Sequence, residues 1–349
     1  MKNITLLVLH FILLTLYISY LVDVTQLWIL GFIAYLIPFS LLLIIISTIL
    51  SLIWKKYMYN IANIFFLIIY ILFTSNYYQI NNNPIKKEKG FTLMSFNAGF
   101  FNNYYKNDPE KYKDKDLNRS GLAMKDYLSK IDVDIKCIQE FYNDSSSNIF
   151  NTFESFLKNN DYFYHYSARQ KKPGRPINGV LILSKFPILN KGEIIFGGND
   201  HNRGVFTDVL INDDTIRIIN VHLKSMALNT SFNNIKKSYY QLKRGLLERS
   251  KEIDNINFFI SNSSYPVILV GDMNEPPYTN NYKKLRKNLD DAFLQQGNGF
   301  GNSYKGKLFF LRLDYILYTS KYIKIINYNT EKAITFSDNY PIITNFVIN

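Results

Sequence analysis

The sequence of 349 residues contains little cysteine, tryptophan and histidine, with 1, 2 and 4 of them respectively. The single cysteine, Cys137, excludes an internal disulfide bond and a zinc site built from several thiolates, and we expect it to be buried in the core. Acidic residues are outnumbered, because 28 Asp and Glu stand against 40 Lys and Arg, which gives a formal net charge of +12. That charge suits an anionic partner such as nucleic acid or a phospholipid surface, although a general bias of the sequence towards Asn, Lys and Ile explains it equally well.

Long apolar runs are confined to the amino-terminal part of the chain, where two segments are close to or above the roughly 20 residues that cross a bilayer as a helix. A third is shorter, but it is too apolar to lie in water. No small-x-small cleavage site follows the first segment, so we favour an uncleaved anchor over a signal peptide. Pro38 lies inside the second segment and is expected to kink it. We predict a transmembrane region over residues 1–78 and a linker over residues 79–90. The three predicted helices are residues 4–22, 27–54 and 61–77.

The lysines beside these segments predict how the membrane region is oriented. Lys55 and Lys56 lie between the second and third segments, whereas residues 23–26, between the first and second, include no basic residue. Because positively charged connections stay cytoplasmic, three spans make this a multi-pass protein of the inner membrane with its large carboxyl-terminal domain on the periplasmic face. A count of two spans inverts that orientation.

Residues 91–349 alternate short apolar runs with helical patterns, as a soluble domain does. Helices are predicted over residues 120–131 and 233–262, and a hairpin turn over residues 212–214. The basic residues of the second helix, Arg249 among them, are predicted to face solvent. Mixed strands and helices of this kind predict two packed β-sheets flanked by helices, an α/β sandwich. The predicted strands are 91–96, 134–139, 216–221, 267–271 and 312–318.

Most of the polar side chains that could bind a metal ion lie in these strands or shortly after them. Each of them alone is most often a turn former or a cap, but together they supply the hard oxygen ligands that Mg²⁺ or Mn²⁺ prefers. Asp272 and Asn274 are two positions apart, which turns both towards one face, and Gly271 lets the backbone bend there. The oxygen-bearing set is Asn97, Glu140, Asp272, Asn274, Asp314 and Asp338.

Six short stretches resemble, in order, the motifs of the endonuclease/exonuclease/phosphatase superfamily, which includes deoxyribonuclease I, inositol polyphosphate phosphatases and neutral sphingomyelinases. The layout of apolar segments followed by such a domain is similar to that of membrane-anchored members found in Bacteroidetes. The resemblance covers residues 91–349 and implies a four-layer α/β sandwich. The matching stretches are residues 94–97, 138–140, 220–223, 271–274, 313–317 and 337–341.

The resemblance also implies which residues bind the metal ion and activate water. Glu140 would bind Mg²⁺ or Mn²⁺ with help from Asn97, and Asp338 would belong to the same metal site. Asp272 would orient or deprotonate the attacking water molecule. A metal ion that neutralises phosphate oxygens and a carboxylate that places water in line are the two requirements of this hydrolysis.

Further residues would bind the substrate. By the same resemblance, His222 would hold the scissile phosphate and stabilise its developing charge, while Asn274 contacts the phosphate and Asp314 completes the polar shell. Arg203 is a further candidate for phosphate binding. The substrate would be a phosphodiester or phosphomonoester, either a nucleic acid or the head group of a phospholipid or sphingolipid. Tethering to the bilayer favours a lipid, and the basic charge favours nucleic acid.

The last stretch departs from the family pattern, which is Ser-Asp-His, because Asn339 stands at the position of the histidine. Asparagine donates a hydrogen bond but exchanges no proton near neutral pH, and acid/base groups contribute roughly 10² to 10⁴-fold to a rate. Three explanations are open: a natural enzyme with weakened or altered chemistry, a deliberate inactivating substitution, or a protein that binds without cleaving. The sequence therefore predicts a membrane-anchored, metal-dependent phosphodiesterase or phosphatase, or else a catalytically inactive binding or scaffolding subunit of a membrane complex.

Overall fold

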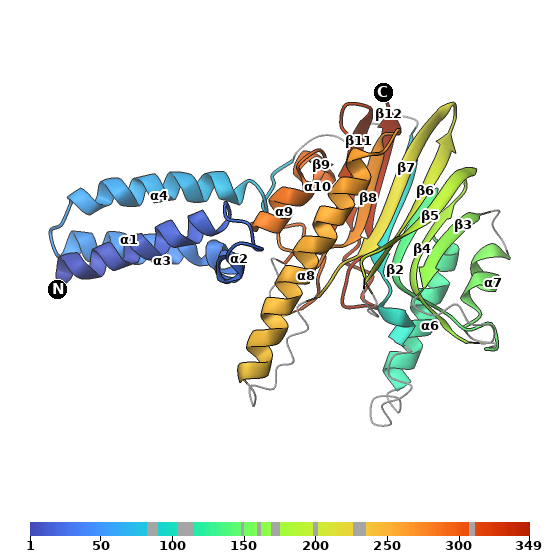
Figure 1. The fold of residues 1–349 in the computed structure, drawn as a ribbon, viewed down its shortest axis with the longest axis horizontal. Coiled ribbons are helices and arrows are strands. Elements are labelled where there is room, and N and C mark those ends of the chain that lie inside the picture. Colours follow the sequence, from blue (N-terminus) through green and yellow to red (C-terminus); the bar gives the residue numbers. More distant parts are fainter. Residues whose placement is uncertain are drawn as a thin grey trace. The chain divides into compact units, whose positions relative to one another are not determined.

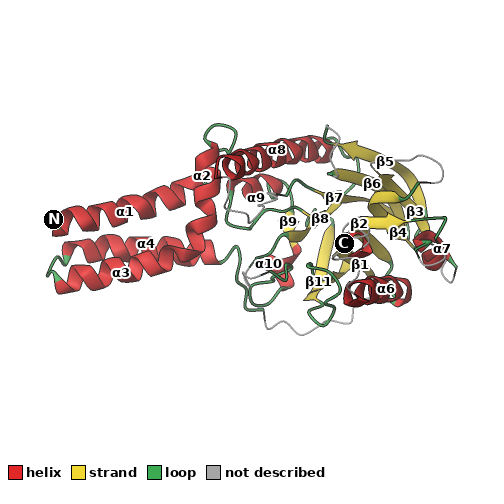
Figure 2. Ribbon diagram, turned by 90° about the horizontal axis from the view of Figure 1, so that it is seen from below, coloured by secondary structure: helices red, strands yellow, loops and turns green. Residues whose placement is uncertain are grey.

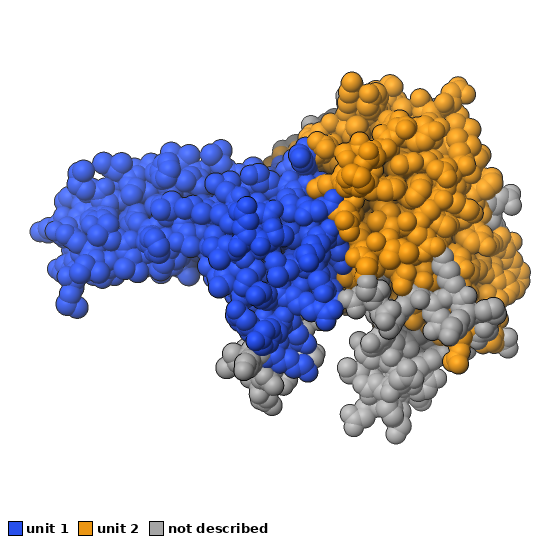
Figure 3. All heavy atoms as spheres, in the orientation of Figure 1, with its two compact units in different colours: residues 1–79, 224–254, 275–287 blue, residues 80–223, 255–274, 288–349 orange. Residues whose placement is uncertain are grey.

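The structure, a computed structural model, groups the chain into two compact units (Figure 3). Unit 1 comprises residues 1–79, 224–254 and 275–287, and unit 2 comprises residues 80–223, 255–274 and 288–349. Most of the predicted linker, residues 82–89, lies outside the described residues, as do residues 233 and 234 of the second predicted helix. The structure describes residues 1–81, 90–102, 115–147, 150–158, 162–168, 175–197, 202–225, 235–306 and 311–349.

Unit 1 begins with a run of apolar helices. The second predicted span is helical from Trp28 to Ile53, but its middle is a 3₁₀-helix that contains Pro38. Proline has no backbone N–H to donate and its ring clashes with the preceding turn of an α-helix, which accounts for the change of helix type at this point. The helices are α1 (Lys2–Ser19), α2 (Trp28–Ile33), η1 (Ala34–Phe39), α3 (Ser40–Ile53) and α4 (Met58–Thr74).

Two of these helical stretches are long and apolar enough to cross a membrane, Lys2–Ser19 and Trp28–Ile53. In each, only 28% of the most apolar window is buried. Large side chains such as Phe11 and Ile53 are 70% and 67% exposed, which is unfavourable in water and normal in lipid. The 17-residue helix α4 is also apolar but falls short of the same length.

The rest of unit 1 comes from later in the chain and includes most of the long helix α8 (Ile235–Ser261) and the short helix α9 (Asn280–Leu285). Leu242 and Leu246 of α8 form a small apolar cluster with Val24, which lies between α1 and α2. Segments that are more than 200 positions apart in the sequence therefore share one core in this unit.

The prediction that the basic face of α8 is solvated is wrong for Arg249, which is fully buried. Its Nε donates to Glu275 at 2.5 Å, its Nη1 to the carbonyl oxygen of Lys224 at 2.7 Å and its Nη2 to the hydroxyl of Tyr35 at 2.8 Å. A buried charge is tolerated only when it is paired and hydrogen-bonded in this way. Position 249 is seven residues after the buried Leu242, so helical spacing places it on the apolar face.

Unit 2 contains two six-stranded mixed sheets (Figures 1 and 2). In each sheet one central pair is parallel, β1 with β2 and β7 with β8, and the other pairs are antiparallel. The first sheet, in spatial order, is β11 (Ile323–Thr330), β12 (Ile342–Ile348), β1 (Phe91–Asn97), β2 (Ile135–Asn143), β4 (Ile177–Ser184) and β3 (Phe163–Ala168). The second is β5 (Ile188–Ile195), β6 (Arg203–Ile211), β7 (Asp214–His222), β8 (Val267–Asp272), β10 (Asp314–Tyr318) and β9 (Asp290–Asp291).

Alternating apolar side chains of the two sheets form one core between them. Leu93 and Cys137 from the first sheet are fully buried in the same cluster as Ile218 and Ile268 from the second. The cysteine thus occupies the core as predicted, and burial raises the pKa of its thiol. Because successive residues of a strand face opposite sides, the alternate residues face outwards and need helices to cover them.

Helices cover both outer faces, as Figure 2 shows for α6 (Lys115–Lys130) and α7 (Thr152–Leu157) on the first sheet. Met124 and Phe156 from these helices share a buried cluster with Met94 of β1. On the second sheet Phe259 of α8 meets Phe206 of β6, with ring centroids 4.9 Å apart. The short helix α10 (Ala292–Gln296) also lies in this unit. The predicted fold, two packed mixed sheets flanked by helices, is confirmed.

The strand register brings several polar strand ends to one edge of the sandwich. In the first sheet Asn97 pairs with Gln139, and in the second His222 and Asp314 both pair with Asp272. The β6–β7 hairpin, which turns at residues 212 and 213 as expected, sets the register of the strand that ends at His222. The fold therefore carries predicted site residues from both sheets to the same edge.

Candidate active site

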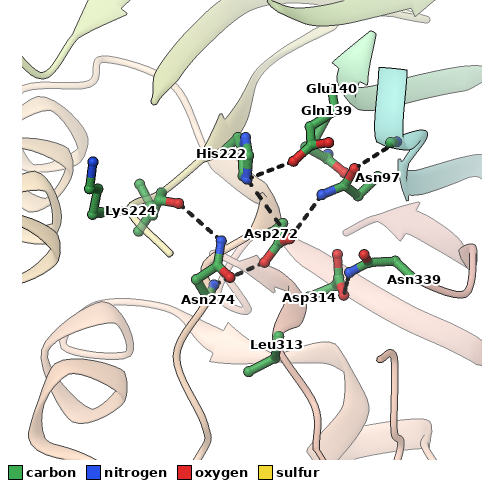
Figure 4. Close-up of polar contacts among 12 residues, drawn as sticks. Asn97, Gln139, Glu140, His222, Lys224, Asp272, Asn274, Leu313, Asp314 and Asn339 are labelled. Atoms are coloured by element: carbon green, nitrogen blue, oxygen red, sulfur yellow. Dashed lines mark hydrogen bonds and ion pairs between the residues drawn. The ribbon is translucent and has the colours of Figure 1, made fainter. Parts of the chain in front are cut away.

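Four of the predicted residues meet where strands β1, β2, β7 and β8 end or bend (Figure 4). The Nε2 atom of His222 lies 3.5 Å from Oε1 of Glu140 and 4.0 Å from Oδ2 of Asp272. Asn97 donates a hydrogen bond from Nδ2 to the same Asp272 oxygen at 3.0 Å. Since Asn97 and Glu140 belong to one sheet and His222 and Asp272 to the other, this cluster exists only when the two sheets are packed together.

Two of the predicted residues adopt a left-handed backbone conformation. Glu140 has φ +48° and lies where the pairing of β2 with β4 shifts between Ile138 and Phe141. Asn274 has φ +51°. A bulge re-aims a side chain, and such conformations cost of order 1 kcal/mol or more and concentrate at functional sites. Strain at these two positions, within a well-packed sandwich, is typical of an active site.

The turn after β8 is built around Gly271, whose φ is +137°. A Cβ atom at this position would lie 1.9 Å from the carbonyl oxygen of Val221, so only glycine fits. Beyond it, the backbone N–H of Asn274 donates to Oδ1 of Asp272 at 2.9 Å, and the Asn274 side chain donates to the carbonyl oxygen of Leu223 at 3.0 Å. These bonds fix Asp272 and Asn274 beside the strand that ends at His222.

Asp314 and Asn339 form a second, buried part of the site. The Nδ2 atom of Asn339 donates to Oδ2 of Asp314 at 2.7 Å, and the two residues are 3% and 2% exposed. Burial, followed by the charge of Asp272, raises the pKa of the Asp314 carboxyl well above its usual value. Within the described residues Oδ1 of Asp314 has no hydrogen-bond partner. Asn339 therefore holds Asp314 by a hydrogen bond but has no proton to exchange.

The other two predicted residues lie at the border of this cluster. Asp338 is exposed, and its carboxylate accepts a hydrogen bond from Ser337 Oγ at 3.3 Å. Partial desolvation and the charge of Asp272 raise the pKa of its carboxyl. Arg203 begins β6 directly opposite His222 in the ladder, so both side chains leave the sheet on the same face.

Two residues that had no predicted role form a hydrogen-bonded bridge between the sheets next to the cluster. Gln139 and Asn220 are fully buried between the sheets, and Gln139 Nε2 donates to Asn220 Oδ1 at 2.6 Å. Asn220 in turn donates to the carbonyl oxygens of Ile138 and Leu181 at 3.1 and 2.9 Å. Both residues lie inside the recognised stretches, directly before Glu140 and two positions before His222. An amide residue in each stretch is visible in the sequence, but only the structure shows that the two are buried and bonded to each other.

The chemistry of the cluster fits a hard divalent cation. Burial raises the pKa of the Glu140 carboxyl, and the charges of Asp272 and Asp338 raise it further against the opposing effect of His222. A cation relieves such crowding of carboxylates. Among the described residues no three His, Cys, Asp or Glu side chains are arranged to enclose a metal ion by themselves. Mg²⁺ needs no such cage, because it is commonly held by one or two carboxylates, water and substrate phosphates.

The sandwich and this polar edge define a phosphoesterase-like protein, and comparison with known proteins supplies the family. The chain belongs to the endonuclease/exonuclease/phosphatase family, whose model matches residues 94–338. Members of this family hydrolyse phosphoester bonds, which supports a hydrolase of phosphoric esters as the broad class of this chain. A search of curated protein sequences returned no match.

Solved structures show the same fold at low sequence identity. A mannosyl-6-phosphatase from Bacteroides thetaiotaomicron is 14% identical with a TM-score of 0.54, covering 74% of this chain and 99% of that one. The catalytic domain of human Nocturnin, with a bound sulfate anion, is 17% identical with a TM-score of 0.52, covering 74% and 95%. An endonuclease/exonuclease/phosphatase family protein from Leptotrichia buccalis is 17% identical with a TM-score of 0.51, covering 74% and 99%.

Proposed function

We propose that the protein is a divalent-metal-dependent phosphodiesterase or phosphatase that its amino-terminal helices anchor in a membrane. The observation that carries this proposal is the position of His222, whose Nε2 lies between the carboxylates of Glu140 and Asp272. A donor flanked by carboxylates suits a phosphate group, because the donor binds a phosphate oxygen while the carboxylates hold a cation and a water molecule.

Glu140 and Asn97 are the residues that would hold the cation, with Asp338 at the border of the site. Mg²⁺ or Mn²⁺, when bound, supplies Lewis-acid neutralisation of the phosphate oxygens. Asn97 already orients Asp272 through its hydrogen bond of 3.0 Å, so the groups that would bind the cation and the water are positioned together before any substrate arrives.

Each remaining residue has a definite task. Asp272 accepts a proton from the attacking water molecule or orients it, and His222 donates from Nε2 to a phosphate oxygen. Asn274, fixed by its bond to the carbonyl oxygen of Leu223, contacts the phosphate, and Arg203 supplies a positive charge on the same face as His222. Preorganised donors of this kind contribute most where they face the charge that develops in the transition state.

The substrate class is a phosphodiester or phosphomonoester. One structural neighbour is a mannosyl-6-phosphatase and another, a Nocturnin catalytic domain, has a bound sulfate anion, so a sugar phosphate is consistent with this fold. Membrane anchorage favours a phospholipid or sphingolipid head group, whereas the net charge of +12 favours nucleic acid. With α4 as a third span, the positive charges of Lys55 and Lys56 favour a periplasmic position of the catalytic domain at the inner membrane.

A second function, a catalytically inactive binding or scaffolding subunit of a membrane complex, is favoured by Asn339. Its side chain donates a hydrogen bond to Oδ2 of Asp314 at 2.7 Å but cannot transfer a proton. An inactive member of the family would keep this bond because it stabilises the buried carboxyl group. Metal and phosphate binding without turnover is the behaviour expected of this second function.

The test uses the full chain in a non-ionic detergent with Mg²⁺ or Mn²⁺. Bis(p-nitrophenyl) phosphate, p-nitrophenyl phosphate, single- and double-stranded DNA and sphingomyelin micelles are the substrates. We expect metal-dependent turnover of at least one, lowered roughly 10² to 10³-fold by His222→Gln and unchanged by the matched control His165→Gln. Absence of turnover by both the natural chain and its Asn339→His variant, with metal still bound, selects the scaffolding function.

The proposed orientation has a separate test. A reporter that is active only in the cytoplasm, fused after Asn349, is expected to stay silent in cells. A strong signal contradicts three spans with a periplasmic domain, and leaves the chemistry of the site untouched.

A further inference from the structure

A cationic pocket in unit 1 is lined by none of the residues proposed for catalysis and has no role in the proposed reaction. Its volume is about 600 Å³. One wall is made by Tyr20 and Leu21, which directly follow α1, and the other by Lys283, Arg286 and Lys287 in and after α9. We call it the α9 pocket.

Its positive charge is not neutralised by the protein. A fourth cation, Lys284, is paired with Asp23 at 3.0 Å and with Asp254 at 2.8 Å. For Lys283, Arg286 and Lys287 the structure shows no ion pair among the residues that it describes. Three unpaired cations around one cavity attract an anion, and the attraction is stronger where the surface is partly shielded from water.

Arg286 carries an additional sign of an incomplete site. Its Nε is buried and has no hydrogen-bond partner within the described part of the chain. Its guanidinium group lies 5.5 Å from the centroid of the Tyr282 ring. A buried donor without a partner costs about 1–3 kcal/mol, and an anion that enters the pocket removes this cost.

The opposite wall is apolar and continues into a helix that is long enough to cross a membrane. Leu21 is 61% exposed, and it extends the exposed apolar surface of α1, to which Phe11 also contributes. Tyr20 connects the apolar wall with the cationic wall, because the ammonium group of Lys283 is 5.6 Å from the centroid of its ring. Tyrosine and lysine at the end of an apolar helix are typical of the level of lipid head groups.

We propose that the α9 pocket binds the phosphate of an anionic phospholipid, whose acyl chains lie along α1. A phosphate beside an apolar tail matches a cationic wall beside an apolar one. A zwitterionic lipid fits less well, because its ammonium group would enter a site that already has three unpaired cations. This proposal rests on the membrane anchorage that forms part of the proposed function, and it is independent of catalysis.

The experiment measures lipid retention by the full chain in a non-ionic detergent, by native mass spectrometry with phosphatidylglycerol or phosphatidylcholine. We expect phosphatidylglycerol to be retained in preference. The double variant Lys283→Gln with Arg286→Gln should weaken it roughly 25-fold, the factor for two membrane-facing cations. A matched control, Lys55→Gln with Lys56→Gln, removes two charges in the connection between α3 and α4, and it should weaken retention much less because neither residue lines the pocket.

The single variant Lys287→Gln, at an exposed position, covers the case in which the double variant unfolds, and it should weaken retention roughly fivefold. Equal retention of the two lipids overturns the proposal, and so does a loss in the control as large as in the double variant. If glycerol 1-phosphate displaces the lipid with an affinity equal to that of the lipid, the pocket is a site for soluble phosphates instead. If an oligonucleotide does so, the pocket is a nucleic-acid site. The His222→Gln variant should retain phosphatidylglycerol as well as the unsubstituted chain does, whether or not the chain is an enzyme. A failure of the catalytic proposal can therefore be distinguished from a failure of the lipid-binding proposal.

Discussion

Substituting Asn339 with histidine is expected to increase the activity of the chain. Asn339 is 3% exposed and its Nδ2 lies 2.7 Å from Oδ2 of Asp314. An imidazole at the same position can direct one ring nitrogen to Asp314, which fixes the tautomer, and leave the other for the substrate. The asparagine already shows that residue 339 and Asp314 are within hydrogen-bonding reach.

The size of the expected increase in kcat follows from the proton transfer that asparagine cannot perform. It keeps the hydrogen bond to Asp314 and loses only proton transfer, which is worth roughly 10² to 10⁴-fold, or about 2.7–5.4 kcal/mol of activation free energy. We therefore expect kcat with Mn²⁺ and bis(p-nitrophenyl) phosphate to rise at least about 100-fold in Asn339→His. The rate should also acquire an additional pH dependence from the new imidazole, near the pKa of histidine, about 6.5.

A second substitution shows whether the gain comes through the observed hydrogen bond. In an Asp314→Asn background the imidazole loses its carboxylate partner, so most of the gain should disappear. The reasoning is refuted if Asn339→His keeps its thermal stability and its Mn²⁺ affinity and yet shows no faster turnover. Equal gains with and without the Asp314 carboxylate contradict the role given to that residue.

Three further predictions concern stability and are measured by unfolding the full chain in detergent. Tyr35→Phe leaves one donor of the buried Arg249 without a partner and should cost about 1.5–3 kcal/mol, whereas the exposed control Tyr57→Phe should cost little. Burial lowers the pKa of Lys136 to about 8 from 10.5, so unfolding takes up a proton between these pH values. The free energy of unfolding should therefore rise by up to about 3 kcal/mol from pH 8 to 10.5. The variant Lys136→Met has no such proton and should not show this rise. Gly271→Ala drives a Cβ to 1.9 Å from a backbone oxygen at φ +137° and should cost about 3 kcal/mol or more; a cost below 1 kcal/mol contradicts the close approach.

The architecture of unit 2 could be predicted from the sequence because its signals are local. Runs such as residues 267–271 are continuous and apolar, and they are buried on both sides in the sandwich. The turn at residues 212 and 213 and the bend at Gly271 follow from single residues with special backbone freedom. The order of the six recognised stretches then implied the fold family.

The bridge of Gln139 and Asn220 and the burial of Arg249 could not be derived in the same way. Both depend on partners that are far away in the sequence, such as Tyr35, which lies 214 positions before Arg249. Charge and polarity predict exposure for an isolated residue, and only the packed structure shows that a partner neutralises them. The irregular pairing that turns Glu140 inwards is likewise a property of two strands together.

The pairing of Asn339 with Asp314 could be predicted only in part from the sequence. The sequence shows that histidine is replaced, but it does not show whether the replacement keeps any contact. The structure shows that it does, at 2.7 Å. The scaffold of the site is therefore retained around one altered group, which is why a single substitution is expected to change the rate so strongly.

The central claim is that side chains from both sheets form one site for a divalent cation, and binding of Mn²⁺ tests it most directly. In a titration of the full chain followed by electron paramagnetic resonance, we expect one bound ion per chain. Glu140→Gln should weaken binding by more than about tenfold, since even changes in residues that only support metal ligands cost 10 to 100-fold. The control Asp213→Asn, which removes a carboxylate in the β6–β7 turn, should bind normally. A chain that binds no Mn²⁺, or a Glu140→Gln variant that binds it as tightly as the natural chain, contradicts the account.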